Sequence, residues 1–223
     1  MARGQRVPEP ALRKPPGRSE PGDPVRRPPV DPVFDPQVLH GIVRDHLDVP
    51  FPDRMEAVVR AVARRYPGHV ATGEPWILNN AGGAMGALKV LHASPWEYLI
   101  LFGSPIGTEG HTGRFRADDY FMILEGEQWA YVPGELTRRV FRPGDLHHLP
   151  RGEAGGYRFP DACWALEYAR GSIASMLPFG LADTLSSTLD LRTFAATAGT
   201  FARLSLRAVG KRLLRRRAEE PAP

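Results

Sequence analysis

Apolar residues recur at helical spacing in two segments near the start of the chain. Between residues 37 and 49 they are three and four positions apart, and the same spacing returns from 53 to 66. This period places them on one face of a helix. Pro67-Gly68 is a typical helix end. The pattern predicts two amphipathic helices within residues 37–72.

From residue 73 to residue 172 the apolar residues alternate with polar ones, and turn sequences such as Pro143-Gly144-Asp145 separate the short runs. Many short strands at this spacing are typical of a barrel or a sandwich. The expected strands are 97–103, 118–124, 127–132, 137–142, 146–149, 156–159 and 163–169, and residues 76–80 fit a strand or a turn.

After Ile173 the pattern becomes helical again, and two helices are expected within residues 173–217. In the second, Arg203, Arg207 and Lys211 are four residues apart, and leucines occupy the other face. A cationic rim beside an apolar face is typical of a helix that lies on a membrane surface. The alternative is a helix that packs on the barrel and leaves its basic end in water.

The two ends of the chain differ from the middle in composition. Residues 1–36 are rich in Pro, Arg, Gly and Asp and hold few large apolar side chains, so we expect a disordered tail. Residues 218–223 form a second, short tail. The basic residues concentrate at both ends, whereas the net charge is only +4.

Several classes of protein are disfavoured by composition. The 223 residues suffice for one domain with a full core, and the single cysteine, Cys163, excludes an internal disulfide framework. We find no run of about 20 apolar residues and no apolar secretory segment, so we expect synthesis in the cytoplasm. Because no aromatic platform accompanies the arginines, nucleic-acid binding is not expected.

The central segment resembles a cupin. The turn 124–127, read Leu-Glu-Gly-Glu, joins two strands, and Pro143-Gly144-Asp145 precedes the next ones. The resemblance implies an α+β fold: a cupin-like β-barrel or sandwich with N-terminal helices and two C-terminal amphipathic helices. Metal-binding cupins carry a His-x-His pair before the acidic position, which is Asp119 here. Residues 112–115 contain no histidine, so a metal-dependent oxygenase is disfavoured and no metal is expected.

Three acidic residues stand in apolar runs. Asp118 and Asp119 begin one strand, and Glu167 lies within 163–168. A buried carboxylate is costly, and two that lie close together drive at least one pKa upward, so one can act as an acid and the other as a base. The Tyr98 hydroxyl could bond to such a carboxylate. An alternative is that both aspartates pair with nearby arginines (Arg114 and Arg116) on the rim.

Residues from about 66 to 200 resemble the family of the fungal sterol C-8 isomerase and the sigma-1 receptor. The resemblance rests on many short motifs in one collinear order, and the Ala117–Phe121 and His147–Leu149 stretches favour the isomerase branch. The motifs are Tyr66–Val70, Asn80–Gly83, Leu91–Ser94, Glu97-Tyr98, Leu101–Gly103, Gly110–Arg114, Ala117–Phe121, Ile123–Gly126, His147–Leu149, Glu167–Gly171, Leu181–Leu185 and Ser187–Asp190.

This resemblance implies which residues form the site. A pocket glutamate of the family matches Glu167, and a tyrosine matches Tyr98. The receptor branch has its second ligand-binding aspartate where this chain has Phe121, so we assign that role to Asp119, with Asp118 as the rival. The expected substrate-binding residues are Tyr98, Phe102, Phe121, His147, Tyr157, Trp164 and Leu177.

The resemblance also implies the chemistry and the partners. A sterol C8=C9 double bond would move to C7=C8 through a cation at C8, without a cofactor. The substrate would be a sterol or another polycyclic lipid, and cationic amphiphiles would inhibit. We expect a homotrimer that contacts the cytoplasmic side of a membrane (the endoplasmic reticulum in a eukaryote) through residues 173–217. The alternative is a non-catalytic, sigma-receptor-like binding protein for cationic amphiphiles or sterols.

Overall fold

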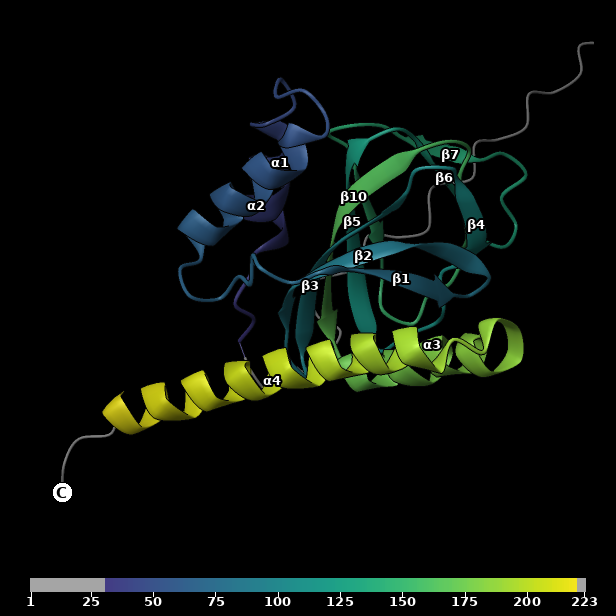
Figure 1. The fold of residues 1–223 in the computed structure, drawn as a ribbon. Helices are drawn as coiled ribbons and strands as arrows, with labels where there is room; N and C mark the ends of the chain where they lie inside the picture. Colours follow the sequence, from purple (N-terminus) through teal and green to yellow (C-terminus); the bar gives the residue numbers. More distant parts are fainter. Residues whose placement is uncertain (1–30, 220–223) are drawn as a thin grey trace, which may run out of the picture.

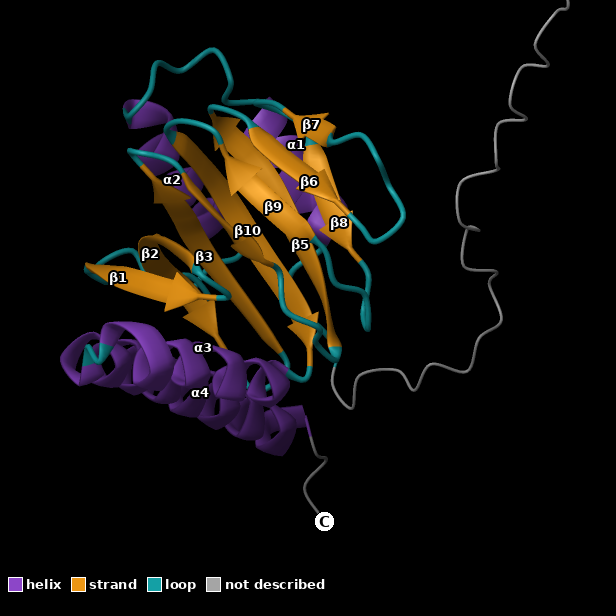
Figure 2. Ribbon diagram, turned by 90° about the vertical axis from the view of Figure 1, so that its right-hand side faces the viewer, coloured by secondary structure: helices purple, strands orange, loops and turns teal. Residues whose placement is uncertain are grey.

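The structure is a computed structural model that describes residues 31–219, except for the side chains of Leu177 and residues 215–219. It contains two antiparallel sheets, two helices near its start and helices at its end (Figures 1 and 2). The predicted α+β class is therefore confirmed, in the form of a sandwich of two sheets. Residues 1–30 of the predicted N-terminal tail and residues 220–223 of the predicted C-terminal tail lie outside the described residues, whereas residues 218–219 belong to the last helix and not to a tail.

Ten strands are described, and most are short. Their bounds are β1 (Trp76–Ala81), β2 (Ala84–Ala93), β3 (Glu97–Ser104), β4 (Thr108–His111), β5 (Ala117–Glu125), β6 (Gln128–Tyr131), β7 (Arg139–Phe141), β8 (Leu146–Leu149), β9 (Gly156–Phe159) and β10 (Cys163–Gly171). The larger sheet has the order β1-β2-β3-β10-β5-β8, and the smaller one has the order β4-β9-β6-β7. The long strands β3, β10 and β5 thus occupy the centre of the larger sheet.

Helices α1 (Pro36–Arg44) and α2 (Asp53–Arg65) cover the outer face of the larger sheet (Figure 1). Their apolar faces meet the side chains that point outward from the central strands, among them Leu99, Met122 and Leu166, in one buried cluster. Alternation along each strand leaves every second side chain for the inner face. The larger sheet is therefore buried on both sides.

The C-terminal elements lie together across one end of the sheets (Figure 2). They are the 3₁₀ turn Ile173–Met176, helix α3 (Leu177–Asp183), the π-helical turn Thr184–Thr188 and the long helix α4 (Leu191–Glu219). Two side chains of α4 hold it to the segment between α2 and β1: Arg203 pairs with Glu74 at 2.5 Å, and Lys211 donates to the Gly68 carbonyl at 2.5 Å. Among the described helices, none is long and apolar enough to span a bilayer.

Strands β2 and β4 were not predicted, because alanine and glycine interrupt the alternation there. Gly86 of β2 shows why such a residue is needed. A Cβ atom at this position would lie 2.6 Å from the Gly103 carbonyl oxygen and 2.9 Å from the Phe102 ring. The close approach of β2 to β3 therefore requires glycine at position 86, and glycine weakens the strand pattern in the sequence.

The ordered chain begins before the predicted boundary at residue 37. Phe34 is 1% exposed, and a buried carboxylate, Glu97, accepts hydrogen bonds from the Val33 and Phe34 amides. Tyr168 donates to the same carboxylate at 2.9 Å. Composition could not reveal this contact, because its acceptor lies more than 60 positions along the chain.

We expect Glu97→Gln to lower the free energy of unfolding by about 2 kcal/mol, because an amide group would face backbone N–H donors and leave one of them unpaired. Urea denaturation measures the change. The matched control is Glu109→Gln, an exposed residue paired with Arg158 at 3.5 Å, which should change stability by less than about 0.5 kcal/mol. Equal midpoints for both variants would contradict the assignment.

Candidate active site

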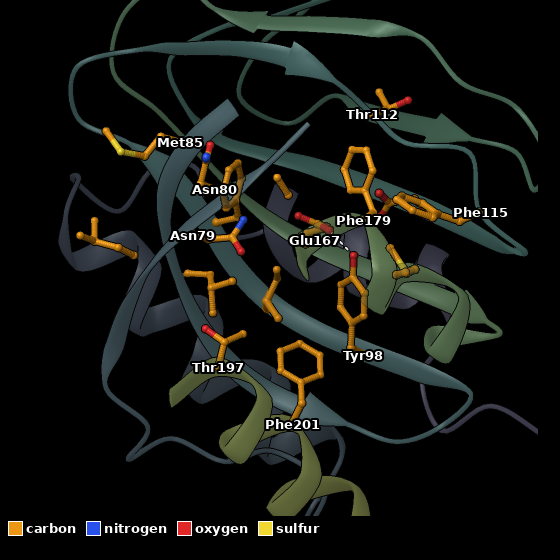
Figure 3. Close-up of a pocket in the computed structure, with 18 of the residues that line it drawn as sticks. Asn79, Asn80, Met85, Tyr98, Thr112, Phe115, Glu167, Phe179, Thr197 and Phe201 are labelled. Carbon is orange, nitrogen blue, oxygen red and sulfur yellow. Dashed lines mark hydrogen bonds between the residues drawn. The ribbon is translucent and has the colours of Figure 1, made fainter. Parts of the chain in front are cut away.

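A cavity of about 460 Å³ lies between the inner face of the larger sheet, the smaller sheet and the C-terminal helices (Figure 3). This volume is typical of a pocket for a small organic molecule. Its walls are mostly apolar, and Phe179 from α3 and Phe201 from α4 close it. The polar side chains of the lining, Asp119 and Glu167 among them, are therefore set in a mostly apolar surface.

Three neighbouring strands bring Tyr98, Glu167 and Asp119 to one part of this cavity. Ala169 of β10 lies opposite Tyr98 of β3 on one side and opposite Asp119 of β5 on the other. Glu167, two positions earlier on β10, points to the same face. Diagonal neighbours of this kind have Cα atoms about 7–8 Å apart, within reach of longer side chains. The small side chain of Ala169 leaves the space between the three polar groups open.

Glu167 is 8% exposed and accepts a hydrogen bond from the Tyr98 hydroxyl (Figure 3). Burial raises the pKa of Glu167 to about 7, although the Tyr98 hydrogen bond favours the ionised form. Burial, together with the Glu167 charge, also raises the pKa of Tyr98 well above its usual range. Tyr98 is therefore a permanent donor that holds Glu167 in place.

Asp119 is the more strongly perturbed of the two acids. Burial, followed by the neighbouring Glu167 charge, raises its pKa well above the usual range. Its Oδ1 atom is buried and has no hydrogen-bond partner among residues 31–219. Two such neighbours cannot both ionise at low cost, so the pair holds one proton. The hydrogen bond from Tyr98 assigns the charge to Glu167 and the proton to Asp119.

Asp118 points to the opposite face of β5 and is excluded from the cavity. Its carboxylate lies 3.5 Å from both the His148 ring and the Arg151 guanidinium, and it accepts from the Arg151 amide at 3.2 Å. Burial raises its pKa, but these contacts outweigh burial and leave the pKa below its usual range. The rim pairing predicted for both aspartates therefore holds for Asp118 alone, with Arg151 rather than Arg114 or Arg116.

Most of the predicted binding residues lie where they were expected. Phe102, Phe121, Tyr157 and His147 line the cavity together with Tyr98. His147 and His148 point to opposite faces of β8, since His148 stacks on Tyr120 outside the cavity with ring centroids 4.4 Å apart. The described residues contain no group of three or more His, Cys, Asp or Glu side chains placed to hold a metal ion.

The prediction for Trp164 is wrong. It precedes Ala165 on β10 and points away from the face of Glu167, and its ring contacts Trp76 at 5.3 Å and Phe51 at 6.5 Å. Its aromatic character was a weaker guide than the alternation of the strand. The side chain of Leu177, the last predicted residue, lies outside the described part of the structure.

Sequence reasoning missed Gln128, Phe179 and Phe201, all of which line the cavity. Gln128 could have been found, because it alternates with Trp129 and shares a face with the buried Ala130. The two phenylalanines could not, because the approach of α3 and α4 to the sheet leaves no local pattern. Phe201 meets the Tyr98 ring at 5.9 Å and so shields the acids from solvent.

Residues 28–217 match the family described as ERG2 and Sigma1 receptor like protein. The C-8 sterol isomerase ERG2 of Gibberella zeae is 58% identical over 136 residues, which are 61% of this chain and 58% of that protein. The C-8 sterol isomerase of Neurospora crassa is 52% identical over 171 residues, 74% of this chain and 66% of that protein. The chain thus spans about three fifths to two thirds of the length of these relatives.

Receptor-type relatives are more distant. The sigma non-opioid intracellular receptor 1 of Gallus gallus is 36% identical over 166 residues, which are 74% of this chain and 75% of that protein. The predicted preference for the isomerase branch is therefore confirmed. Among solved structures, an RmlC-like cupin from Shewanella frigidimarina shares 20% identity with a TM-score of 0.39, covering 47% of this chain and 92% of that one.

The raised pKa of Glu167 predicts how stability depends on pH. The pKa of Glu167 is about 7 in the folded protein and 4.5 in the unfolded chain. The protonated side chain therefore adds to the free energy of unfolding below pH 4.5, and this contribution is lost as the pH rises through about 7. We expect Glu167→Gln to match the wild type near pH 4 and to exceed its free energy of unfolding by roughly 1–3 kcal/mol at pH 8.

Denaturation of both proteins from pH 4 to pH 8 measures this difference. Tyr98→Phe is the matched variant. Removal of the hydrogen bond should raise the pKa of Glu167, so the pH-dependent loss of stability should occur at a higher pH than in the wild type. A difference between wild type and Glu167→Gln that stays constant with pH would contradict the assigned pKa.

Proposed function

Because this chain belongs to the ERG2 and Sigma1 receptor like protein family, we propose that it is a sterol isomerase that moves the C8=C9 double bond to C7=C8. The observation that supports this most directly is the pair of inward carboxyl groups, Asp119 and Glu167. They share an apolar cavity, and neither has an ion-pair partner among the described side chains. Such a site can donate a proton, accept one and stabilise a cation between the two events.

In the first step, Asp119 donates its proton to C9. The π electrons of the C8=C9 bond form the new C9–H bond, and C8 is left as a tertiary cation. Asp119 suits this role because burial, followed by the Glu167 charge, raises the pKa of its carboxyl group well above the usual range and so favours the protonated form. The ionised Glu167 lies beside the developing charge, and the aromatic walls exclude water that would otherwise capture the cation.

In the second step, Glu167 removes a proton from C7. The C7–H electrons form the C7=C8 double bond and neutralise C8, so the product is an isomer of the substrate. The enzyme is left with Asp119 ionised and Glu167 protonated, and proton transfer between them restores the starting state. Tyr98 keeps its own proton throughout and orients the base.

The alternative function is non-catalytic binding of sterols or cationic amphiphiles, as in the receptor branch. A protonated amine beside Glu167 would resemble the C8 cation, so the same pocket favours such amines as ligands and, in our proposal, as inhibitors. Asp119 favours catalysis, because an amine needs one anion whereas a double-bond shift needs an acid as well. We extend the proposal, from the family resemblance alone, to assembly as a homotrimer.

We further propose that the C-terminal elements lie on a membrane surface. More than half of the exposed large apolar side chains in the described chain belong to them: Leu181, Leu185, Leu189, Leu191, Leu206, Leu213 and Leu214. The exposed Arg207 and Lys211 accompany the leucines on α4. Apolar side chains beside basic ones are the pattern of an interfacial helix. The same helices close the cavity, so a lipid substrate would enter from the membrane.

The activity is tested with a Δ8-sterol in deuterated water. We expect a Δ7-sterol that carries deuterium at C9, because the donated proton of Asp119 exchanges with solvent. Asp119→Asn and Glu167→Gln should each lower kcat by roughly 10²- to 10⁴-fold, the usual contribution of a general acid or base. Mass spectrometry measures the rate at which labelled product forms, and NMR locates the deuterium in the product.

Asp118→Asn is the matched control, because it changes the adjacent carboxylate on the opposite face and should keep most of the activity. Circular dichroism spectra of all variants should be unchanged. Tight binding of a cationic amphiphile by the wild type, without any labelled product, would instead support the non-catalytic function.

Membrane contact is tested by flotation with liposomes that contain anionic lipid. Leu206→Glu combined with Leu213→Glu should lower the bound fraction severalfold, because each change places a charge on the apolar face of α4. Leu136→Glu, which alters a leucine that is 99% exposed in a loop remote from α4, should float like the wild type. Equal flotation of all three proteins would contradict the proposed membrane face.

A further inference from the structure

A second polar group lines the cavity besides the two acids. Gln128 of β6 and His147 of β8 come from different sheets, and they are 3% and 6% exposed. His147 Nδ1 and Gln128 Oε1 are 3.0 Å apart. Both residues line the cavity that also contains Glu167. A buried polar pair in an apolar wall is costly unless its remaining polar atoms bond to something.

The position of this pair relative to Glu167 follows from strand register. Phe121 of β5 lies opposite Glu167 on one side and opposite His147 on the other. His147 is therefore two strand spacings from Glu167 in the same row, roughly 10 Å along the sheet. Asp119 is two positions before Phe121 on β5, so His147 is also a diagonal neighbour of Asp119 and lies on the other side of β5 from Glu167.

The hydrogen-bond chemistry of the pair is specific. Gln128 Oε1 accepts, so His147 Nδ1 carries the proton, His147 Nε2 is left as an acceptor, and the Gln128 amide group is left as a donor. If the amide donates to Nδ1 instead, its oxygen becomes the free acceptor and His147 Nε2–H the free donor. Either arrangement presents one donor and one acceptor. Neither remaining nitrogen bonds to any other side chain or backbone group of the described chain.

His147 is held neutral and in a fixed orientation. Burial, followed by the charge of Arg139, lowers its pKa to about 4. Its ring stacks on Phe141 with centroids 4.4 Å apart. A neutral, fixed donor–acceptor pair does not attract an anion or a cation, and its complement is a group that both donates and accepts one hydrogen bond. An alcohol is that group.

We propose that Gln128 and His147 form a subsite for the hydroxyl group of the substrate, which for a sterol is the hydroxyl at C3. This inference rests on the proposed function. The C3 hydroxyl is in ring A, and the reacting C7, C8 and C9 are in the adjoining ring B. An anchor at one place along the wall therefore directs ring B toward Asp119 and Glu167 and selects hydroxylated polycycles over hydrocarbon alkenes.

The test compares a Δ8-sterol with its 3-deoxy and 3-keto analogues. The wild type should prefer the 3-hydroxy compound over the 3-deoxy compound by roughly ten- to a hundredfold in kcat/KM, because the deoxy compound leaves both polar side chains unpaired. The 3-keto compound accepts a hydrogen bond but does not donate one, so its kcat/KM should lie between those of the 3-hydroxy and 3-deoxy compounds. A wild-type enzyme that uses all three equally would overturn the subsite.

The informative variant is Gln128→Met combined with His147→Phe. Removal of both partners by apolar groups of similar shape leaves no unpaired atom, so the fold should survive. Its 3-hydroxy to 3-deoxy ratio should fall to about one. His148→Phe, the adjacent histidine outside the cavity, should keep the wild-type ratio. A double variant that retains the preference would refute the proposal.

Binding separates this inference from the proposed activity. Dissociation constants of the 3-hydroxy and 3-deoxy sterols, measured by calorimetry, should show the same preference in the wild type and none in the double variant. If the wild type binds with this preference but yields no product, the isomerase function is wrong and the hydroxyl subsite stands. If the two proteins show equal ratios, or the wild type binds neither sterol, the subsite is wrong.

Discussion

The structure depends on one constraint, which is that two acidic side chains share a cavity with no ion-pair partner among residues 31–214. Asp119 and Glu167 tolerate this only because one proton stays between them and Tyr98 donates to the charged member. The shared proton and the Tyr98 hydrogen bond both require that the three side chains keep their positions to within a fraction of an ångström. Three adjacent strands at the centre of a sheet buried on both faces supply that rigidity.

The two faces of the larger sheet have separate tasks. The outer face packs against α1 and α2, and Glu97 fastens the segment before α1 through backbone amides. The inner face leaves a cavity, because small residues such as Ala169 stand between the polar groups. Two buried carboxylates of the larger sheet therefore have different roles. Glu97 is satisfied by several donors and is structural, whereas Asp119 has an unpaired oxygen and is available for chemistry.

The C-terminal helices connect the chemistry to the surroundings of the protein. Phe179 and Phe201 line the cavity from the C-terminal helices, and several leucines of the same elements are exposed. One structural unit therefore keeps water from the acids and presents an apolar surface outside. In our proposal, a lipid substrate passes from that surface to a site whose two polar places, the acids and the Gln128–His147 pair, orient it.

Much of this protein was determined by its sequence alone. The alternation of β3, β5 and β10 set which face each residue occupies and so placed Asp119, Glu167 and Tyr98 on the cavity side, and collinear motifs identified the family. Tertiary structure decided the rest: the partner of Asp118, the early start at Phe34 and the position of Phe201 at the cavity. Each of these depends on which distant segment packs against a residue. Local periodicity carries no information about such contacts, because it records the face of a side chain and not its neighbour.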